Sequence, residues 1–152
     1  MTVYQRLKIV GYRIINPIRR VYWFVVRPNT RGTKCLLENN NSFLLVRLNY
    51  AHRKWTLPGG GVNKKETFKD AAIRETKEEV GIDIVNPTLI GTYTRDIEYK
   101  KDTVEVYHAN TETTDFYLDP VEIKEAKWFS RDSLPQDRQQ SIDMIFEMYD
   151  RS

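Results

Sequence analysis

Apolar residues recur every three or four positions through the first 27 residues, from Val3 to Val25. This spacing predicts an amphipathic helical arm with basic side chains beside its apolar stripe. Pro17 lacks a backbone N–H, so we expect a break near Asn16 and two shorter helical segments.

Three interpretations of this arm fit the pattern, and the sequence does not choose among them. It packs on its own domain, it forms a homodimer interface, or it makes a peripheral membrane contact through its basic apolar face. We therefore treat residues 1–27 as an N-terminal arm and residues 28–152 as one domain.

From Gly32 onward the pattern becomes that of β-strands. Two apolar runs, Thr33–Glu38 and Ser42–Leu48, are separated by three asparagines, which predicts a hairpin. Further strands are expected at residues 87–94, 103–110 and 113–118.

Two segments have helical spacing instead. Residues 68–80 follow Thr67, whose spacing to Asp70 is that of a capping box, and precede Gly81, which suits a left-handed helix end. Residues 138–150 carry apolar side chains at helical intervals and are expected to dock on the sheet.

The helix expected at residues 68–80 carries Glu75, Glu78 and Glu79 at positions i, i+3 and i+4. Their carboxylates should therefore converge on one face, which continues the apolar stripe of the helix. Inward carboxylates without neighbouring bases call for a cation, and hard oxygen ligands suit Mg²⁺ or Mn²⁺.

Length, net charge and cysteine content limit the class of protein further. A chain of 152 residues is long enough for a single domain with a sizeable core. Its net charge of +3 fits an anionic small-molecule substrate and does not argue for a stable nucleic-acid complex. The one cysteine, Cys35, excludes an internal disulfide and is expected to be a buried thiol. No secretory signal or bilayer-spanning run is apparent, so we expect a cytoplasmic protein.

Residues 60–82, GGVNKKETFKDAAIRETKEEVGI, resemble the signature of the Nudix hydrolase superfamily, in the MutT-like form. That signature is Gly-x5-Glu-x7-Arg-Glu-U-x-Glu-Glu-x-Gly-U, where U is a bulky apolar residue. Every fixed position matches, and the one departure is Thr76 at the first U position, where threonine keeps β-branched bulk. The preceding WTLPGGG of residues 55–61 is also typical of the family.

The resemblance covers about residues 32–135 and implies an α/β/α sandwich with a mixed sheet. It also implies hydrolysis of a nucleoside diphosphate linked to another group X, with Mg²⁺ or Mn²⁺ as cofactor. The metal ligands that it implies are the carbonyl of Gly59 and the carboxylates of Glu75, Glu78 and Glu79.

The resemblance leaves the general base open among Glu78, Glu79 and Glu122. The role of Glu122 follows from its position six residues before Trp128, with Glu125 as second choice. Arg74 is expected to orient a carboxylate such as Glu66.

Substrate identity is decided outside the signature. A nucleoside triphosphate, including an oxidised one, is the first expectation, and a dinucleoside polyphosphate or ADP-ribose follows. The candidate substrate-binding residues are Arg47, Tyr99 and Gly60. An alternative from another class is a nucleotide-sensing binding module with little turnover.

Overall fold

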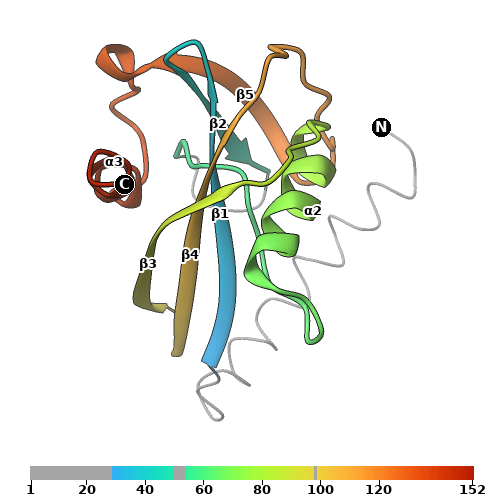
Figure 1. Ribbon diagram of the computed structural model, residues 1–152, viewed down its shortest axis with the longest axis vertical. Coiled ribbons are helices and arrows are strands. Elements are labelled where there is room, and N and C mark those ends of the chain that lie inside the picture. The colour runs from blue at the N-terminus through green and yellow to red at the C-terminus, as the bar shows by residue number, and fades with distance from the viewer. Residues whose placement is uncertain (1–28, 50–53, 98) are drawn as a thin grey trace.

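The computed structural model describes residues 29–49, 54–97 and 99–152, arranged as Figure 1 shows. The elements in these ranges are β1 (Asn29–Asn39), β2 (Ser42–Leu48), α2 (Phe68–Val80), β3 (Thr88–Ile97), β4 (Lys100–Asn110), β5 (Ile123–Ser130), the 3₁₀ helix η1 (Arg131–Ser133) and α3 (Ser141–Tyr149).

The described strands form one mixed sheet in the order β3-β4-β1-β2-β5. β1 runs parallel to β4, and the other neighbours are antiparallel. Successive side chains of β1 point to opposite faces. Leu37 packs in a core cluster with Val80 of α2, whereas Leu36 packs in a second cluster with Ile142 of α3. The sheet therefore lies between the two helices, and the expected α/β/α sandwich is confirmed (Figure 1).

Helix α2 begins and ends where its capping residues predict. The hydroxyl of Thr67 accepts a hydrogen bond from the backbone N–H of Asp70 at 3.1 Å. Gly81 adopts the left-handed conformation, with φ 73°, and its N–H donates to the carbonyl of Lys77. These local interactions satisfy backbone groups that a helix end leaves unpaired.

The expected hairpin is also present, since β1 pairs with β2 across Asn40 and Asn41. Both asparagines have positive φ, of 46° and 61°. Asparagine tolerates this region better than most residues, which explains the turn.

The strand expected at residues 113–118 is wrong. This segment runs past the end of α2, where the N–H of Tyr117 donates to the carbonyl of Val80 at 2.9 Å. The N–H of Asp119 likewise donates to the carbonyl of Glu79 at 3.1 Å. The backbone of this segment thus bonds to the helix terminus instead of to a neighbouring strand, although its apolar side chains still pack on the core.

Strands β3 and β4 extend further than expected, to Ile97 and from Lys100. The extension places Arg95 opposite Asp102 across this pair, and Thr30 of β1 opposite Asp102 on the other side. The three residues form one row across three neighbouring strands.

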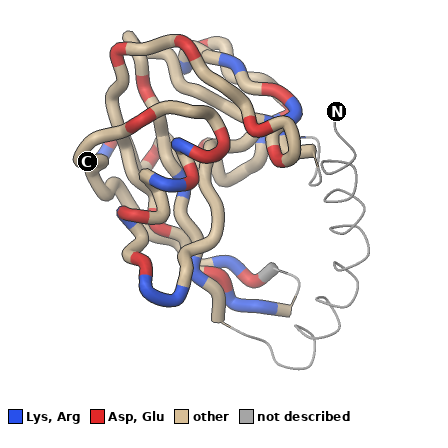
Figure 2. Tube along the Cα trace, turned by 90° about the vertical axis from the view of Figure 1, so that its right-hand side faces the viewer, with Lys and Arg blue, Asp and Glu red and all other residues tan. Residues whose placement is uncertain are grey.

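The predicted arm, residues 1–27, lies outside the described residues. Within the described part, no helix is long and apolar enough to cross a membrane. Basic and acidic residues are interspersed along the described chain, as Figure 2 shows.

Candidate active site

A glycine-rich loop, residues 57–61, runs antiparallel alongside β1 and is bonded to it. The N–H of Thr33 donates to the carbonyl of Gly60, and the N–H of Cys35 donates to that of Pro58, each at 2.9 Å. Gly59 has φ 139°, and a Cβ there would lie 2.2 Å from the carbonyl oxygen of Thr33. This position therefore requires glycine.

The same loop also packs on α2. A Cβ on Gly60 would lie 2.4 Å from the carboxyl carbon of Glu75. The N–H of Gly59 donates to Oε2 of Glu79 at 2.8 Å. Two carboxylates of the signature thus lie directly against the backbone of the loop.

Arg74 joins the start of the signature to its acidic end. Its Nε and Nη2 donate to the two carboxylate oxygens of Glu66 at 2.7 and 2.9 Å, so the expected contact between these residues is present. Its Nη1 donates to Glu75 at 2.7 Å and to Glu78 at 3.1 Å. Bonds from Arg74 and from the N–H of Asn63 lower the pKa of Glu66 to about 2. A bidentate arginine–carboxylate pair of this kind fixes both groups in orientation.

Glu79 is the most deeply buried carboxylate of the signature, with 3% of the residue exposed. Burial raises its pKa to about 7, although Lys34 and the N–H of Gly59 favour the ionised form. The nearby carboxylates of Glu75 and Glu122 act on this pKa in the same direction as burial. The structure therefore brings Glu122 into the neighbourhood of Glu79.

Lys34 is a residue of the site to which we assigned no role from the sequence. Its Nζ donates to the carbonyl of Leu57 at 2.8 Å and lies 3.5 Å from that of Gly59. Burial lowers its pKa, while the charge of Glu79 opposes that change. The available signal was a lone cation within the apolar run of β1, a position where charge is rare unless it is paired.

Glu78 corrects one expectation. We predicted that all three glutamates face inward, but the side chain of Glu78 is 59% exposed, against 13% for Glu75. Glu78 lies one turn after Arg74 on α2 and forms an ion pair with it at the exposed side of the helix.

The donor set fits a divalent cation in its chemistry. The carbonyl of Gly59 and the carboxylates of Glu75 and Glu79 are hard oxygen donors on adjoining segments, and such donors suit Mg²⁺ or Mn²⁺. A cation beside Glu79 would favour its ionised form against the burial and the neighbouring carboxylates that raise its pKa. Among the described residues, the structure contains no group of three or more histidine, cysteine or acidic side chains that could hold a metal ion.

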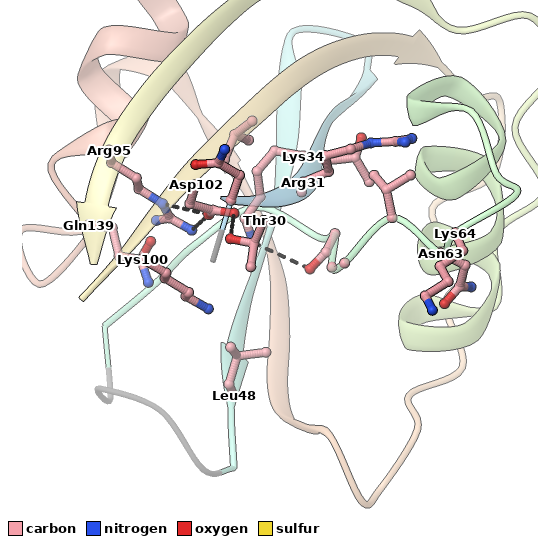
Figure 3. Close-up of a pocket in the computed structure, with 18 residues that line it drawn as sticks. Thr30, Arg31, Lys34, Leu48, Asn63, Lys64, Arg95, Lys100, Asp102 and Gln139 are labelled. Carbon is pink, nitrogen blue, oxygen red and sulfur yellow. Dashed lines mark hydrogen bonds and ion pairs between the residues drawn. The ribbon is translucent and has the colours of Figure 1, made fainter. Parts of the chain in front are cut away.

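A cavity of about 840 Å³ opens beside the glycine loop, and its lining includes Gly59, Gly60 and Lys34 (Figure 3). Gly60, a candidate substrate-binding residue, is thus among the residues that line this cavity. Pockets of this size accommodate nucleotide-sized ligands.

The other two candidate substrate-binding residues, Arg47 and Tyr99, are not among the described residues that line this cavity. Arg47 forms an ion pair with Asp137 and lies over the ring of Trp55, 4.6 Å from its centroid. Tyr99 is 52% exposed in the turn between β3 and β4. Their proposed contacts with substrate stay predictions.

Comparison with known proteins agrees with this geometry. The NUDIX domain family model matches residues 28–148. The crystal structure of the MutT protein from Methanosarcina mazei Go1 is 30% identical and superposes with a TM-score of 0.73, covering 83% of this chain and 96% of that one.

Curated relatives match over shorter stretches. The uncharacterized Nudix hydrolase YvcI of Bacillus subtilis (strain 168) is 39% identical over 64 residues, which are 42% of this chain and 40% of that protein. The 8-oxo-dGTP diphosphatase of Proteus vulgaris is 33% identical over 72 residues, 46% of this chain and 64% of that protein. Each alignment spans less than two thirds of the relative.

Proposed function

The chain belongs to the Nudix hydrolase family, and from that premise we propose that it hydrolyses the pyrophosphate of a nucleoside diphosphate linked to a group X. The observation that carries this proposal is the contact between the glycine loop and the buried carboxylate of Glu79. That contact lies at the edge of a cavity large enough for a nucleotide.

Members of this family generally use divalent metal ions. We infer that Glu75, Glu79 and the carbonyl of Gly59 would hold Mg²⁺ or Mn²⁺ here, with Glu78 at the exposed rim. When bound, such an ion neutralises phosphate charge and lowers the pKa of a water molecule.

The chain itself supplies orientation and a proton acceptor. Arg74 keeps Glu75 beside the loop, because its guanidinium donates hydrogen bonds to Glu75 and also to Glu66 and the carbonyl of Gly61. The general base is Glu78, Glu79 or Glu122. Burial supports Glu79 or Glu122 over Glu78, because an exposed carboxylate paired with Arg74 is a weaker base.

We propose a nucleoside triphosphate, oxidised or not, as the first substrate to test. The structural likeness to a MutT protein and the similarity to an 8-oxo-dGTP diphosphatase support this choice. A dinucleoside polyphosphate and ADP-ribose are the next candidates. A binding module with little turnover is less well supported, because burying Glu79 destabilises the fold and binding alone does not require it.

We further propose that residues 28–152 form the catalytic domain and act on a small molecule, without a stable nucleic-acid complex. The cytoplasmic location stays a prediction. So do the three interpretations of residues 1–27.

The test is a phosphate-release screen of the full chain over triphosphates, oxidised triphosphates, dinucleoside polyphosphates and ADP-ribose, with Mg²⁺ and then Mn²⁺. We expect turnover of at least one class. Glu79→Gln should lower kcat at least about a hundredfold, because it removes a metal ligand or the base. Glu112→Gln, at an exposed residue in another segment, is the matched control. Absence of turnover throughout the panel with both metals would refute the proposal.

A further inference from the structure

We propose that Lys34 is a positioning residue of the candidate metal site. Its ammonium group holds the carbonyl of Leu57, fixes the glycine loop against β1, and leaves the carbonyl of Gly59 open to a divalent cation. This inference rests on the proposed function and deepens it, because it concerns how the chain prepares one expected metal ligand. In this role Lys34 acts through the loop and not on the substrate.

The carbonyl groups of the glycine loop divide into two sets. Those of Pro58 and Gly60 accept hydrogen bonds from N–H groups of β1, each at 2.9 Å. Successive carbonyls of an extended backbone point in opposite directions, so the carbonyls of Leu57 and Gly59 point away from those N–H groups. A buried carbonyl needs a partner, and Leu57 is buried, with 1% of the residue exposed. Its carbonyl therefore needs a donor other than the backbone of β1.

Lys34 supplies this donor. Its Nζ donates to the carbonyl of Leu57 at 2.8 Å, a normal length for a charge-assisted hydrogen bond. The distance from Nζ to the carbonyl oxygen of Gly59 is 3.5 Å, which is long for a hydrogen bond. Lys34 thus holds the first residue of the loop firmly, while the carbonyl of Gly59 is only weakly engaged and can accept a stronger partner.

The surrounding charges favour the ammonium form of Lys34. Burial lowers the pKa of Lys34, and the charge of Arg95 acts in the same direction. The carboxylates of Glu79, Glu75 and Asp102 act in the opposite direction. Figure 3 shows Lys34 in the middle part of the cavity wall. A charged donor is therefore electrostatically supported at this position, between the carboxylates of α2 and the row that contains Asp102.

The position of Gly59 affects the site at two atoms. Its N–H donates to Oε2 of Glu79 at 2.8 Å, and its carbonyl is an expected metal ligand. A Cβ on Gly59 would lie 2.9 Å from Cα of Lys34, so the loop lies directly against this residue of β1. Because Mg²⁺ requires nearly ideal coordination geometry, a small shift of the loop weakens binding. A side chain that holds Leu57 in place therefore also preserves the ligand geometry two residues later.

Hydrogen exchange of the full chain without metal tests whether Lys34 holds the loop. Lys34→Met keeps a similar length but removes the charge and the donor. We expect the N–H groups of Cys35 and Gly59, which bond to the loop or within the site, to exchange about tenfold faster in this variant. The N–H of Thr111 donates to the carbonyl of Glu38 near the other end of β1, and its exchange should change less than about twofold. Equal acceleration at all three would indicate a general loss of stability and overturn the inference.

Titration with Mn²⁺ alone, followed by the electron paramagnetic resonance signal of the free ion, tests the consequence for the metal site. We expect Lys34→Met to weaken Mn²⁺ binding about tenfold. Removal of a positive charge near a cation site would by itself tighten binding, so the direction of the change separates positioning from repulsion. Lys101→Met is the matched control, since Lys101 is exposed in β4 and is not among the described residues that line the cavity. It should change Mn²⁺ binding less than about twofold.

The outcomes separate this inference from the proposed function. Unchanged or tighter Mn²⁺ binding by Lys34→Met, or weaker binding without faster exchange at Gly59, would overturn the inference and leave the proposed function standing. Absence of Mn²⁺ binding by the wild type would instead count against the metal-dependent function, and exchange at Gly59 would still decide whether Lys34 holds the loop.

Steady-state kinetics on a substrate found in the screen distinguish positioning from substrate binding. Lys34→Met should lower kcat about tenfold and change KM less than about twofold, because Lys34 acts through the loop. A raised KM with an unchanged kcat would identify Lys34 as a substrate ligand and overturn its assignment as a positioning residue.

Discussion

Arg74→Gln should destabilise the fold at neutral pH and lose that effect in acid. Arg74 and the N–H of Asn63 lower the pKa of Glu66 from 4.5 to about 2. At about 1.4 kcal/mol per pH unit, this corresponds to about 3 kcal/mol of stabilisation of the ionised form. The side chain of Glu66 is 14% exposed and Asn63 supplies part of the effect, so we assign about 2 kcal/mol to Arg74.

The direction with pH follows from the lowered pKa of Glu66. A carboxylate whose folded pKa lies below its unfolded value stabilises the protein above the unfolded pKa. This stabilisation is lost as pH falls from about 4.5 toward the folded value near 2. The difference in free energy of unfolding between wild type and Arg74→Gln should therefore be about 2 kcal/mol at pH 7 and shrink steadily below pH 4.5.

Urea unfolding, followed by circular dichroism at a series of pH values, measures this difference. Arg151→Gln is the control, since Arg151 and Glu147 form an ion pair with 77% and 67% of their side chains exposed. Such a surface pair contributes little, so the control should differ from wild type by less than about 1 kcal/mol. A difference for Arg74→Gln that is the same at pH 7 and pH 3 would refute the reasoning.

Two further predictions concern the loop and the core. Gly59→Ala should destabilise the fold by about 3 kcal/mol in thermal or urea unfolding, because the new Cβ would meet the carbonyl of Thr33. Gly61→Ala is the control, since a Cβ at Gly61 would have no atom within 4 Å. It should change the free energy of unfolding by less than about 0.5 kcal/mol. Equal effects of the two would contradict this account. Burial raises the pKa of the Cys35 thiol to about 12. A thiol reagent at pH 8 should therefore label Cys35 only when urea unfolds the protein. Rapid labelling of the native protein would contradict the burial of this side chain.

The features of the fold and site that the sequence predicted depend on interactions between residues close together in the chain. The ends of α2 depend on Thr67, Asp70 and Gly81, which lie within one turn of the groups that they cap. The hairpin of β1 and β2 depends on its own asparagines. The contact between Arg74 and Glu66 joins residues eight positions apart within the signature. In each case the partners are close in the chain, so the residue pattern carries the information.

The features of the fold and site that the sequence did not predict depend on contacts between residues from different parts of the chain. Residues 113–118 have the apolar character of a strand, yet the N–H of Tyr117 bonds to the carbonyl of Val80 at the end of α2. Glu78 shares the spacing of Glu75 and Glu79, but the glycine loop contacts those two, and the side chain of Glu78 is 59% exposed. A pattern of apolar residues predicts which side chains will be buried. It does not predict which backbone groups will form hydrogen bonds with the segment.

The sequence by itself determined the helix that carries the carboxylates, the hairpin before it, the glycine loop and the family. Each of these rests on neighbours in the chain. Only the tertiary structure decided that Lys34 meets the carbonyl of Leu57, and that Thr30, Asp102 and Arg95 form one row at the cavity. That row depends on the parallel pairing of β1 with β4, two strands separated by 60 residues, whose register is set by packing across the whole sheet.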